Sequence, residues 1–188
     1  MDAVLHVPEG VEVRITAIED AEIAVQKVKN SNSFESHFYT QEECKSAEFG
    51  KGTMQETSTR IVRTVIDAST SPKSAMVIGE VINFPGKWSS YPPHAHKQPE
   101  VYHYRFYPKQ GFGFSMLGTD DAYIVKNCYT STLDPDKVHS QTSAPGYAMY
   151  YIWMIPHIAE QKWSREVTYF HDDHKWLLEP GAKIWPEL

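Results

Sequence analysis

The sequence predicts an all-β protein, and three observations support this class. Aromatic residues make up 13% of the chain and include 11 Tyr and 5 Trp, side chains that fit the pleated surface of a sheet. The chain also contains 12 prolines, a residue type that is frequent in turns. Short runs of β-branched and aromatic residues recur at close intervals, which is typical of a sandwich or a barrel.

The predicted strands are separated by Gly, Pro, Asn, Asp or Ser and have lengths typical of strands. They cover residues 11–17, 21–28, 60–66, 75–84, 101–107, 111–117, 122–127, 147–155 and 167–170. Helical periodicity is short wherever it occurs. We expect only a helix near residues 41–47 and a helical turn near residues 171–178.

The length of 188 residues allows one large domain, or one domain and part of another. Residues 29–59 are rich in Ser, Asn, Glu, Gly and Thr, which indicates a connecting segment. We therefore assign residues 1–71 to a partial N-terminal unit with its connection, and residues 72–188 to a complete barrel. Because a short open sheet leaves an edge uncovered, we expect residues 1–71 to pack on the barrel or on another chain.

Charge and hydropathy exclude several classes of partner. The chain has 18 Lys and Arg against 24 Asp and Glu, a formal charge of -6, and it lacks the basic stripe that nucleic-acid binding needs. No stretch approaches the roughly 20 apolar residues of a membrane span, and the start MDAVLHVPEGVEVR is unlike a secretory signal. We therefore expect a cytoplasmic protein without nucleic-acid or membrane partners.

Residues 85–106 carry the sharpest chemical signal. His94 and His96 are two residues apart, so both imidazoles point to one face of an extended chain. Glu100 starts the next predicted strand after a short turn. Two imidazoles and a carboxylate form an incomplete site for a divalent first-row metal, and His139 lies where a later strand could supply a fourth ligand. The alternative is that these histidines only form hydrogen bonds.

His94-x-His96-x3-Glu100 followed by a distant His139 resembles the metal motif of the cupin superfamily. More closely, several segments resemble, in order, the 5-deoxy-glucuronate isomerases of bacterial inositol catabolism. They are WSSYPPH (88–94), EVYHYRF (100–106), QGF (110–112), TDD (119–121), APGY (144–147) with YY (150–151), and FHDD (170–173) with Trp176. The resemblance covers residues 72–178 specifically and extends weakly to residues 1–71.

This resemblance implies a bicupin, in which each cupin is a double-stranded β-helix or jelly-roll barrel. The C-terminal barrel would bind a divalent metal, Zn, Mn, Fe or Ni, through His94, His96, Glu100 and His139. The implied activity is a metal-dependent aldose–ketose isomerisation of 5-deoxy-glucuronate to 2-deoxy-5-keto-gluconate. Relative to that family we expect a shortened N-terminal cupin in residues 1–71.

Tyr102 and Tyr104 are candidates for catalytic proton transfer. Strict strand alternation puts both on the face that carries Glu100, and an isomerase needs a group that moves a proton between neighbouring carbons. The alternative role for both rings is packing in the barrel core.

Four further residues are candidates for binding a sugar acid. Lys97 and Arg105 are cations near the metal motif, and guanidinium pairs bidentately with carboxylate, although alternation points Arg105 to the face opposite Glu100. Tyr91 and Gln110 lie in segments that match the family. Surface ion pairing or turn packing is the competing role for each.

Two other functions remain open. One is a sugar-acid-binding cupin without catalysis, and the other is a related uronate isomerase or a metal cupin oxygenase. In each case we expect a small-molecule ligand and a homo-oligomer, a dimer or larger, in which a partner covers the strands of residues 1–71.

Overall fold

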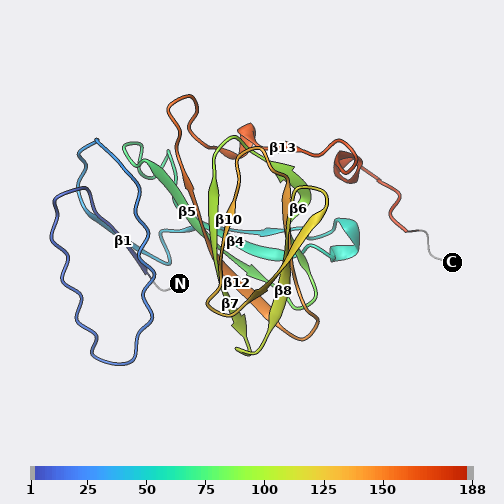
Figure 1. The fold of residues 1–188 in the computed structure, drawn as a ribbon, viewed down its shortest axis with the longest axis horizontal. Helices are drawn as coiled ribbons and strands as arrows, with labels where there is room; N and C mark the ends of the chain where they lie inside the picture. Colours follow the sequence, from blue (N-terminus) through green and yellow to red (C-terminus); the bar gives the residue numbers. More distant parts are fainter. Residues whose placement is uncertain (1–2, 186–188) are drawn as a thin grey trace.

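The computed structural model describes residues 3–185 (Figure 1). Within this range the strands form sheets of two, six and five strands. The helical structure there consists of short 3-10 turns at Met54–Glu56, Arg165–Val167 and Lys175–Leu178. No helix in the described range is long and apolar enough to cross a membrane. The predicted all-β class is confirmed.

The six-stranded sheet is antiparallel throughout and has the order β10-β7-β12-β5-β4-β3. Its strands are β10 (Thr130–Leu133), β7 (Glu100–Tyr107), β12 (Ala148–Pro156), β5 (Met76–Asn83), β4 (Arg60–Ile66) and β3 (Lys45–Phe49). In β7 and β12, buried and partly exposed residues alternate, because successive side chains of a strand point to opposite faces.

The five-stranded sheet has the order β13-β6-β11-β8-β9. Its strands are β13 (Tyr169–Phe170), β6 (Trp88–Ala95), β11 (His139–Ser143), β8 (Phe112–Leu117) and β9 (Asp121–Lys126). A separate hairpin pairs β1 (Ala3–His6) with β2 (His37–Thr40).

The barrel interior is apolar on one side and polar on the other. The large sheet contributes a buried cluster that includes Tyr104, Tyr151 and Trp153. The smaller sheet contributes buried polar residues such as Ser89 and Gln141, which hydrogen-bond to the tyrosine hydroxyls: Ser89 Oγ lies 2.5 Å from Tyr151 Oη, and Tyr104 Oη donates to Gln141 at 2.7 Å. Polar side chains therefore line part of the barrel interior, where a binding site can form.

The six-stranded sheet continues across the predicted boundary at residue 71. β4 pairs with β5, and β3 pairs with β4, so residues 45–66 share a sheet with the barrel. A second apolar cluster, which includes Tyr39, Ile66 and Ile78, joins β2 to this sheet. That residues 1–71 are part of a second cupin stays a prediction.

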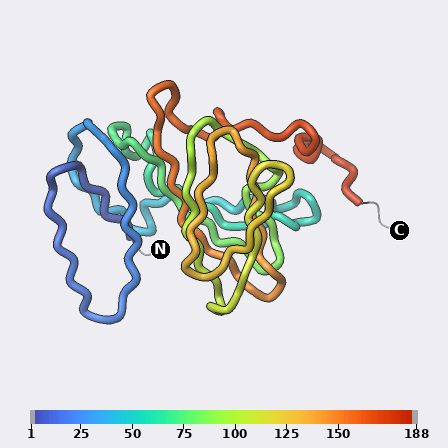
Figure 2. Tube along the Cα trace, viewed as in Figure 1, coloured from blue at the N-terminus to red at the C-terminus, as the bar shows by residue number. Residues whose placement is uncertain are grey.

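Two predicted strands and one predicted helix are wrong. Residues 7–36, all of them described, form neither strand nor helix, although 11–17 and 21–28 alternate apolar and polar side chains. They form a wide loop beside the barrel (Figure 2), so their pattern has no neighbouring strand with which to pair. Residues 41–47 form a turn followed by the first residues of β3, because this edge segment pairs with β4 rather than folding on itself.

The other predicted strands correspond to β4, β5, β7, β8, β9, β12 and β13. The predicted turn near 171–178 contains the 3-10 turn at Lys175–Leu178. Strands β1, β2, β3, β6, β10 and β11 were not predicted. β6 contains Pro92 and Pro93, and proline argues against a strand interior, while β11 reads HSQTS and lacks the apolar alternation that identifies a strand.

Candidate metal centre

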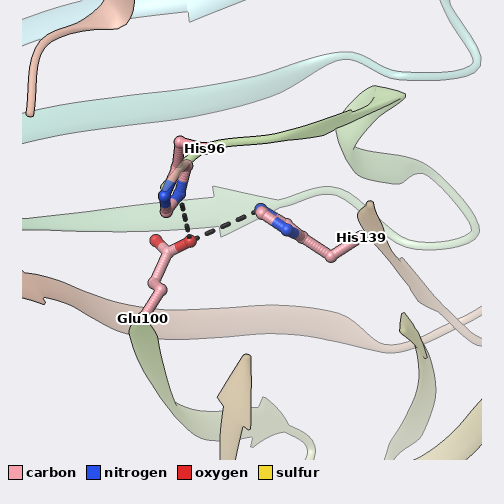
Figure 3. A group of neighbouring side chains, drawn as sticks. All are labelled: His96, Glu100 and His139. Atoms are coloured by element: carbon pink, nitrogen blue, oxygen red, sulfur yellow. Dashed lines mark hydrogen bonds and ion pairs between the residues drawn. The ribbon is translucent and has the colours of Figure 1, made fainter. Parts of the chain in front are cut away.

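Three side chains from three strands or strand ends meet inside the barrel (Figure 3). Glu100 opens β7, His139 opens β11, and His96 follows the last residue of β6. Glu100 Oε2 lies 3.2 Å from His96 Nε2 and 3.4 Å from His139 Nε2. All three residues are buried, and their candidate ligand atoms lie within 4.8 Å of one another. The sequence therefore folds two imidazoles and a carboxylate into one compact group.

Each histidine of the motif is oriented by a main-chain carbonyl. His94 Nδ1 donates to Pro92 at 3.0 Å, His96 Nδ1 donates to Gln98 at 3.0 Å, and His139 Nδ1 donates to Lys137 at 3.1 Å. Because a carbonyl only accepts, Nδ1 is the donor in each ring, which leaves Nε2 of His96 and of His139 to face Glu100 Oε2. Such second contacts typically fix the rotation and tautomer of metal-binding histidines.

Burial lowers the pKa of two of the histidines, which favours the neutral imidazole that binds a metal. It lowers the pKa of His94 from 6.5 to about 4, and it lowers the pKa of His139 well below its ordinary value. Both rings are thus neutral at pH 7 and keep a lone pair. Burial raises the pKa of Glu100, against contacts from His96 and Tyr102 that lower it, so this carboxylate lacks the cation that would compensate its desolvation.

A divalent cation fits this group. His139 Nε2 is buried and has no hydrogen-bond partner in the described part of the chain, although buried polar atoms are normally satisfied. A metal would satisfy this atom and offset the burial of Glu100. Two neutral nitrogens and one carboxylate oxygen form a donor set that suits Zn, Mn, Fe or Ni.

His94 lies beside the compact group of three. Its ring centroid is 4.8 Å from that of His139 and 5.8 Å from Phe170, and it is only partly buried. The structure thus brings the four predicted ligands into one neighbourhood, with three of them in closest approach. That His94 is the fourth ligand stays a prediction.

The two candidate catalytic tyrosines lie on the inner face of β7, as alternation predicts. The Tyr102 ring centroid is 6.2 Å from that of His139, and its hydroxyl shares a 3.0 Å hydrogen bond with Ser90. Tyr104 lies farther along the strand, donates to Gln141 and accepts from Ser131 at 2.8 Å. The Tyr104 hydroxyl is thus hydrogen-bonded on both sides, and catalytic proton transfer by either tyrosine stays a prediction.

Two of the four predicted substrate-binding residues lie away from the metal group. Arg105 points to the opposite face of β7, where it pairs with Glu22 at 2.5 Å. Gln110 is exposed in the turn after β7, whereas Glu100 begins that strand, and an eight-residue strand is roughly 25 Å long. The structure therefore does not bring these two residues to the His–Glu–His group, because strand direction separates residues that are near in sequence.

The other two predicted substrate-binding residues lie nearer the metal motif. Lys97 is exposed in the turn between β6 and β7, directly after His96. Tyr91 lies on β6, and its ring packs against Trp88 at 5.4 Å. Substrate contact by either residue stays a prediction.

Two residues that the motif reading missed support the group. Gln98 lies in the turn, and its main-chain carbonyl accepts from His96 Nδ1. Its side-chain Nε2 donates to the main-chain carbonyl of Gln161 at 2.9 Å. Trp163 packs against the His96 ring at 6.1 Å. The position of Gln98 between two candidate ligands is a signal that the sequence carries, whereas nothing in the sequence connects Trp163 with the motif.

The chain is similar to proteins named 5-deoxy-glucuronate isomerase. It is 27% identical over 189 residues to the one from Halalkalibacterium halodurans, covering 93% of this chain and 67% of the relative. It is 28% identical over 180 residues to the one from Bacillus licheniformis, covering 88% of this chain and 63% of the relative. The chain thus spans about two thirds of the length of these relatives.

Two solved structures share the fold. An IolB-like protein from Salmonella typhimurium superposes with a TM-score of 0.67 at 23% identity, over 79% of this chain and 58% of that one. A cupin-like protein from Thermotoga maritima superposes with a TM-score of 0.50 at 16% identity, over 61% of this chain and 77% of that one. The predicted cupin fold is confirmed.

A family model described as KduI/IolB matches residues 2–177. This range includes the His–Glu–His group, the tyrosines of β7 and every strand of the described residues. The protein belongs to the KduI/IolB family.

Proposed function

We propose that this chain is a metal-dependent aldose–ketose isomerase that converts 5-deoxy-glucuronate to 2-deoxy-5-keto-gluconate in myo-inositol catabolism. The observation that carries the proposal is the buried group of His96, Glu100 and His139, in which Nε2 of both imidazoles faces the carboxylate. Relatives that share most of this chain's length are named for this activity.

The reaction moves a proton between two neighbouring carbons through an enediolate. A divalent ion bound by His96, Glu100 and His139, with His94 as a fourth ligand, would stabilise the negative charge of that intermediate. The protein supplies orientation, because carbonyl contacts fix the rings, and exclusion of water, because the group is buried.

Tyr102 is our choice for the residue that handles the proton. Burial is the main cause that raises its pKa well above 10.0, so its Oη keeps a proton at neutral pH and can donate a hydrogen bond to a substrate oxygen. Ser90 shares a hydrogen bond with this oxygen and holds it in place. Such positioned acid–base groups typically contribute 10²- to 10⁴-fold, roughly, to rate.

The test is incubation of the metal-loaded protein with 5-deoxy-glucuronate in D₂O, followed by NMR. We expect the keto product, with deuterium incorporated at the carbon that receives the proton. Tyr102→Phe should lower kcat by about 100-fold or more, whereas Tyr107→Phe, at an exposed ring on the same strand, should leave it unchanged.

Other outcomes correspond to the rival functions. Saturable binding of the sugar acid without turnover would instead make the chain a binding cupin. Consumption of oxygen with the substrate would indicate an oxygenase, and turnover of other uronates in preference would indicate a uronate isomerase. Each of these results would overturn the proposed activity.

We further propose that the protein acts in the cytoplasm as a homodimer or larger homo-oligomer. Apolar side chains are exposed along residues 7–36, among them Ile15, Ile18 and Val25, and a second copy of the chain could cover them. Sedimentation at micromolar concentration should give at least twice the mass of the chain. A stable monomer would contradict the proposal.

A further inference from the structure

Arg60 stands on the inner face of the large sheet although it is a cation. It begins β4 and is two residues from Val62, which belongs to the interior cluster, so both share one face of the strand. Its strand partners are Phe49 on β3 and Asn83 on β5. Arg60 is only partly exposed, so its guanidinium is partly withdrawn from water.

A second arginine converges on the same place from a distant part of the chain. Arg165 lies in the 3-10 turn at Arg165–Val167. Its guanidinium is 4.9 Å from the Phe49 ring centroid, and that of Arg60 is 5.6 Å from the same centroid. Arg165 Nη2 also donates to Thr64 on β4 at 3.4 Å. Both guanidiniums thus lie over the same aromatic ring.

Neither guanidinium forms an ion pair with a carboxylate in the described part of the chain, although the charge of Asp67 acts on Arg165 at longer range. Arg60 Nη1 donates to the Ser58 carbonyl at 2.7 Å, and no ion pair involves Arg60 or Arg165 within residues 3–185. By contrast, Arg63 on the other face of β4 pairs with Glu80 at 2.8 Å. Two neighbouring cations without a carboxylate are unfavourable unless an anion joins them.

This pair of arginines lies close to the candidate metal centre. Arg165 is two residues from Trp163 in the chain, and the Trp163 ring lies 6.1 Å from that of His96. Phe49, the ring that both guanidiniums face, packs against the same interior cluster as Trp163. The two arginines therefore lie beside the part of the barrel interior that adjoins His96.

We propose that Arg60 and Arg165 form the subsite that binds the carboxylate of the sugar-acid substrate. Guanidinium groups bind carboxylates through strong charge-assisted hydrogen bonds. With the carboxylate held there, the carbonyl end of a six-carbon chain is directed to the His–Glu–His group. The inference rests on the proposed function for the identity of the substrate, and it assigns the specificity for an acid to residues outside the metal motif.

The test compares binding of an acid with binding of its neutral counterpart. Isothermal titration calorimetry of the metal-loaded protein would use 5-deoxy-glucuronate and 5-deoxyglucose, in which a hydroxymethyl group replaces the carboxylate. We expect Arg60→Gln and Arg165→Gln each to weaken binding of the acid by about 10- to 100-fold. Binding of the neutral sugar should change less than about 2-fold.

Two controls separate the subsite from general effects of charge and folding. Arg14→Gln removes the same charge from an exposed residue of the segment 7–36 and should leave both affinities unchanged. Arg60→Lys keeps the charge without the planar fork and should recover part of the affinity for the acid. Thermal unfolding of each variant checks that the barrel remains folded.

The outcomes distinguish this inference from the proposed function. If the wild type isomerises 5-deoxy-glucuronate and both Gln variants bind it as tightly as the wild type does, the subsite is wrong and the activity stands. If the wild type binds the acid through these arginines without turnover, the activity is wrong and the subsite stands. If the wild type binds no sugar acid, both are wrong.

Discussion

The barrel and the segment 7–36 have similar sequence patterns, but the apolar side chains are buried in the barrel and exposed in the segment. In β12, the buried residues Met149, Tyr151, Trp153 and Ile155 alternate with partly exposed ones, and Ile155 is 1% exposed. In the segment, alternating apolar residues remain in solvent, and Ile18 is 97% exposed. β12 lies between β5 and β7, whereas the segment pairs with no strand of the described chain (Figure 2). Alternation of apolar and polar residues therefore identifies a face of the chain that can be buried. The face is buried only where a neighbouring strand pairs with it.

The largest expected effect is stabilisation of the barrel by a metal. A saturating divalent ion at about 1,000 times its Kd should add about 4 kcal/mol to the free energy of unfolding, because the ligands converge only in the folded barrel. Calorimetry with Zn, Mn, Fe and Ni would measure this. Limited proteolysis within residues 7–36 should proceed at the same rate with and without metal. If none of these metals raised the Tm, metal would not stabilise the barrel, and the two regions would not differ in this respect.

A matched pair of isoleucine substitutions tests the contrast in burial. Ile155→Ala should lower the free energy of unfolding by about 3 kcal/mol, since it leaves a cavity in the core. Ile18→Ala makes the same chemical change at an exposed position and should cost less than about 0.5 kcal/mol. Urea denaturation of both variants gives the comparison. Equal losses would mean that the segment is as well packed as the barrel.

Asp67 connects the edge strand β3 to the turn after β4, and its effect should depend on pH. Burial acts to raise its pKa, but hydrogen bonds from Ser69 and Thr70, with Lys45, outweigh it and lower the pKa from 3.8 to about 2. A carboxyl group with a depressed pKa stabilises the fold above its unfolded pKa and loses this contribution as the pH falls toward its folded value.

Asp67→Asn should therefore cost about 1 kcal/mol at pH 7, a value reduced for the partial exposure of the group. The difference from the wild type should shrink as the pH falls from about 4 to 2. The control Asp134→Asn changes an exposed residue and should show no such trend. A difference that is constant with pH would exclude the titration of Asp67 as its cause.

The smallest expected effect concerns the contact between the two regions. Arg105 on β7 pairs with Glu22 of the segment, and an ion pair at the surface contributes about 1 kcal/mol or less. Arg105→Gln should leave the barrel's unfolding within about 0.5 kcal/mol of wild type and raise the rate of proteolysis within residues 7–36. A large loss of barrel stability would show that the segment supports the core.

The sequence predicted those parts of the fold and site that depend on local pattern. The apolar alternation of β7 and β12 identified the core strands, and the spacing of His94, His96 and Glu100 identified one end of the metal group. β11 was missed because its buried face carries Ser and Gln, which bond to interior tyrosines rather than packing as apolar residues. Local patterning cannot reveal such a strand.

The other differences between the predicted and the observed site depend on contacts between parts of the chain that are far apart in sequence. Arg60 and Arg165 are far apart in sequence and meet over Phe49 only in the folded chain. Arg105 and Gln110 are near the motif in sequence, yet one lies on the other face of β7 and the other beyond its far end. Distance along the chain is therefore a poor guide to the lining of a barrel.

The most direct test of the metal centre is the metal content of the purified protein after loading with Zn²⁺ and removal of free ion. We expect about one equivalent per wild-type chain and less than about a tenth of this for His139→Ala, since a lost ligand leaves an incomplete donor set. The control His103→Ala, on the opposite face of β7 where its ring meets Thr130, should keep the full equivalent. Equal metal content in the wild type and His139→Ala would contradict the assignment of the site.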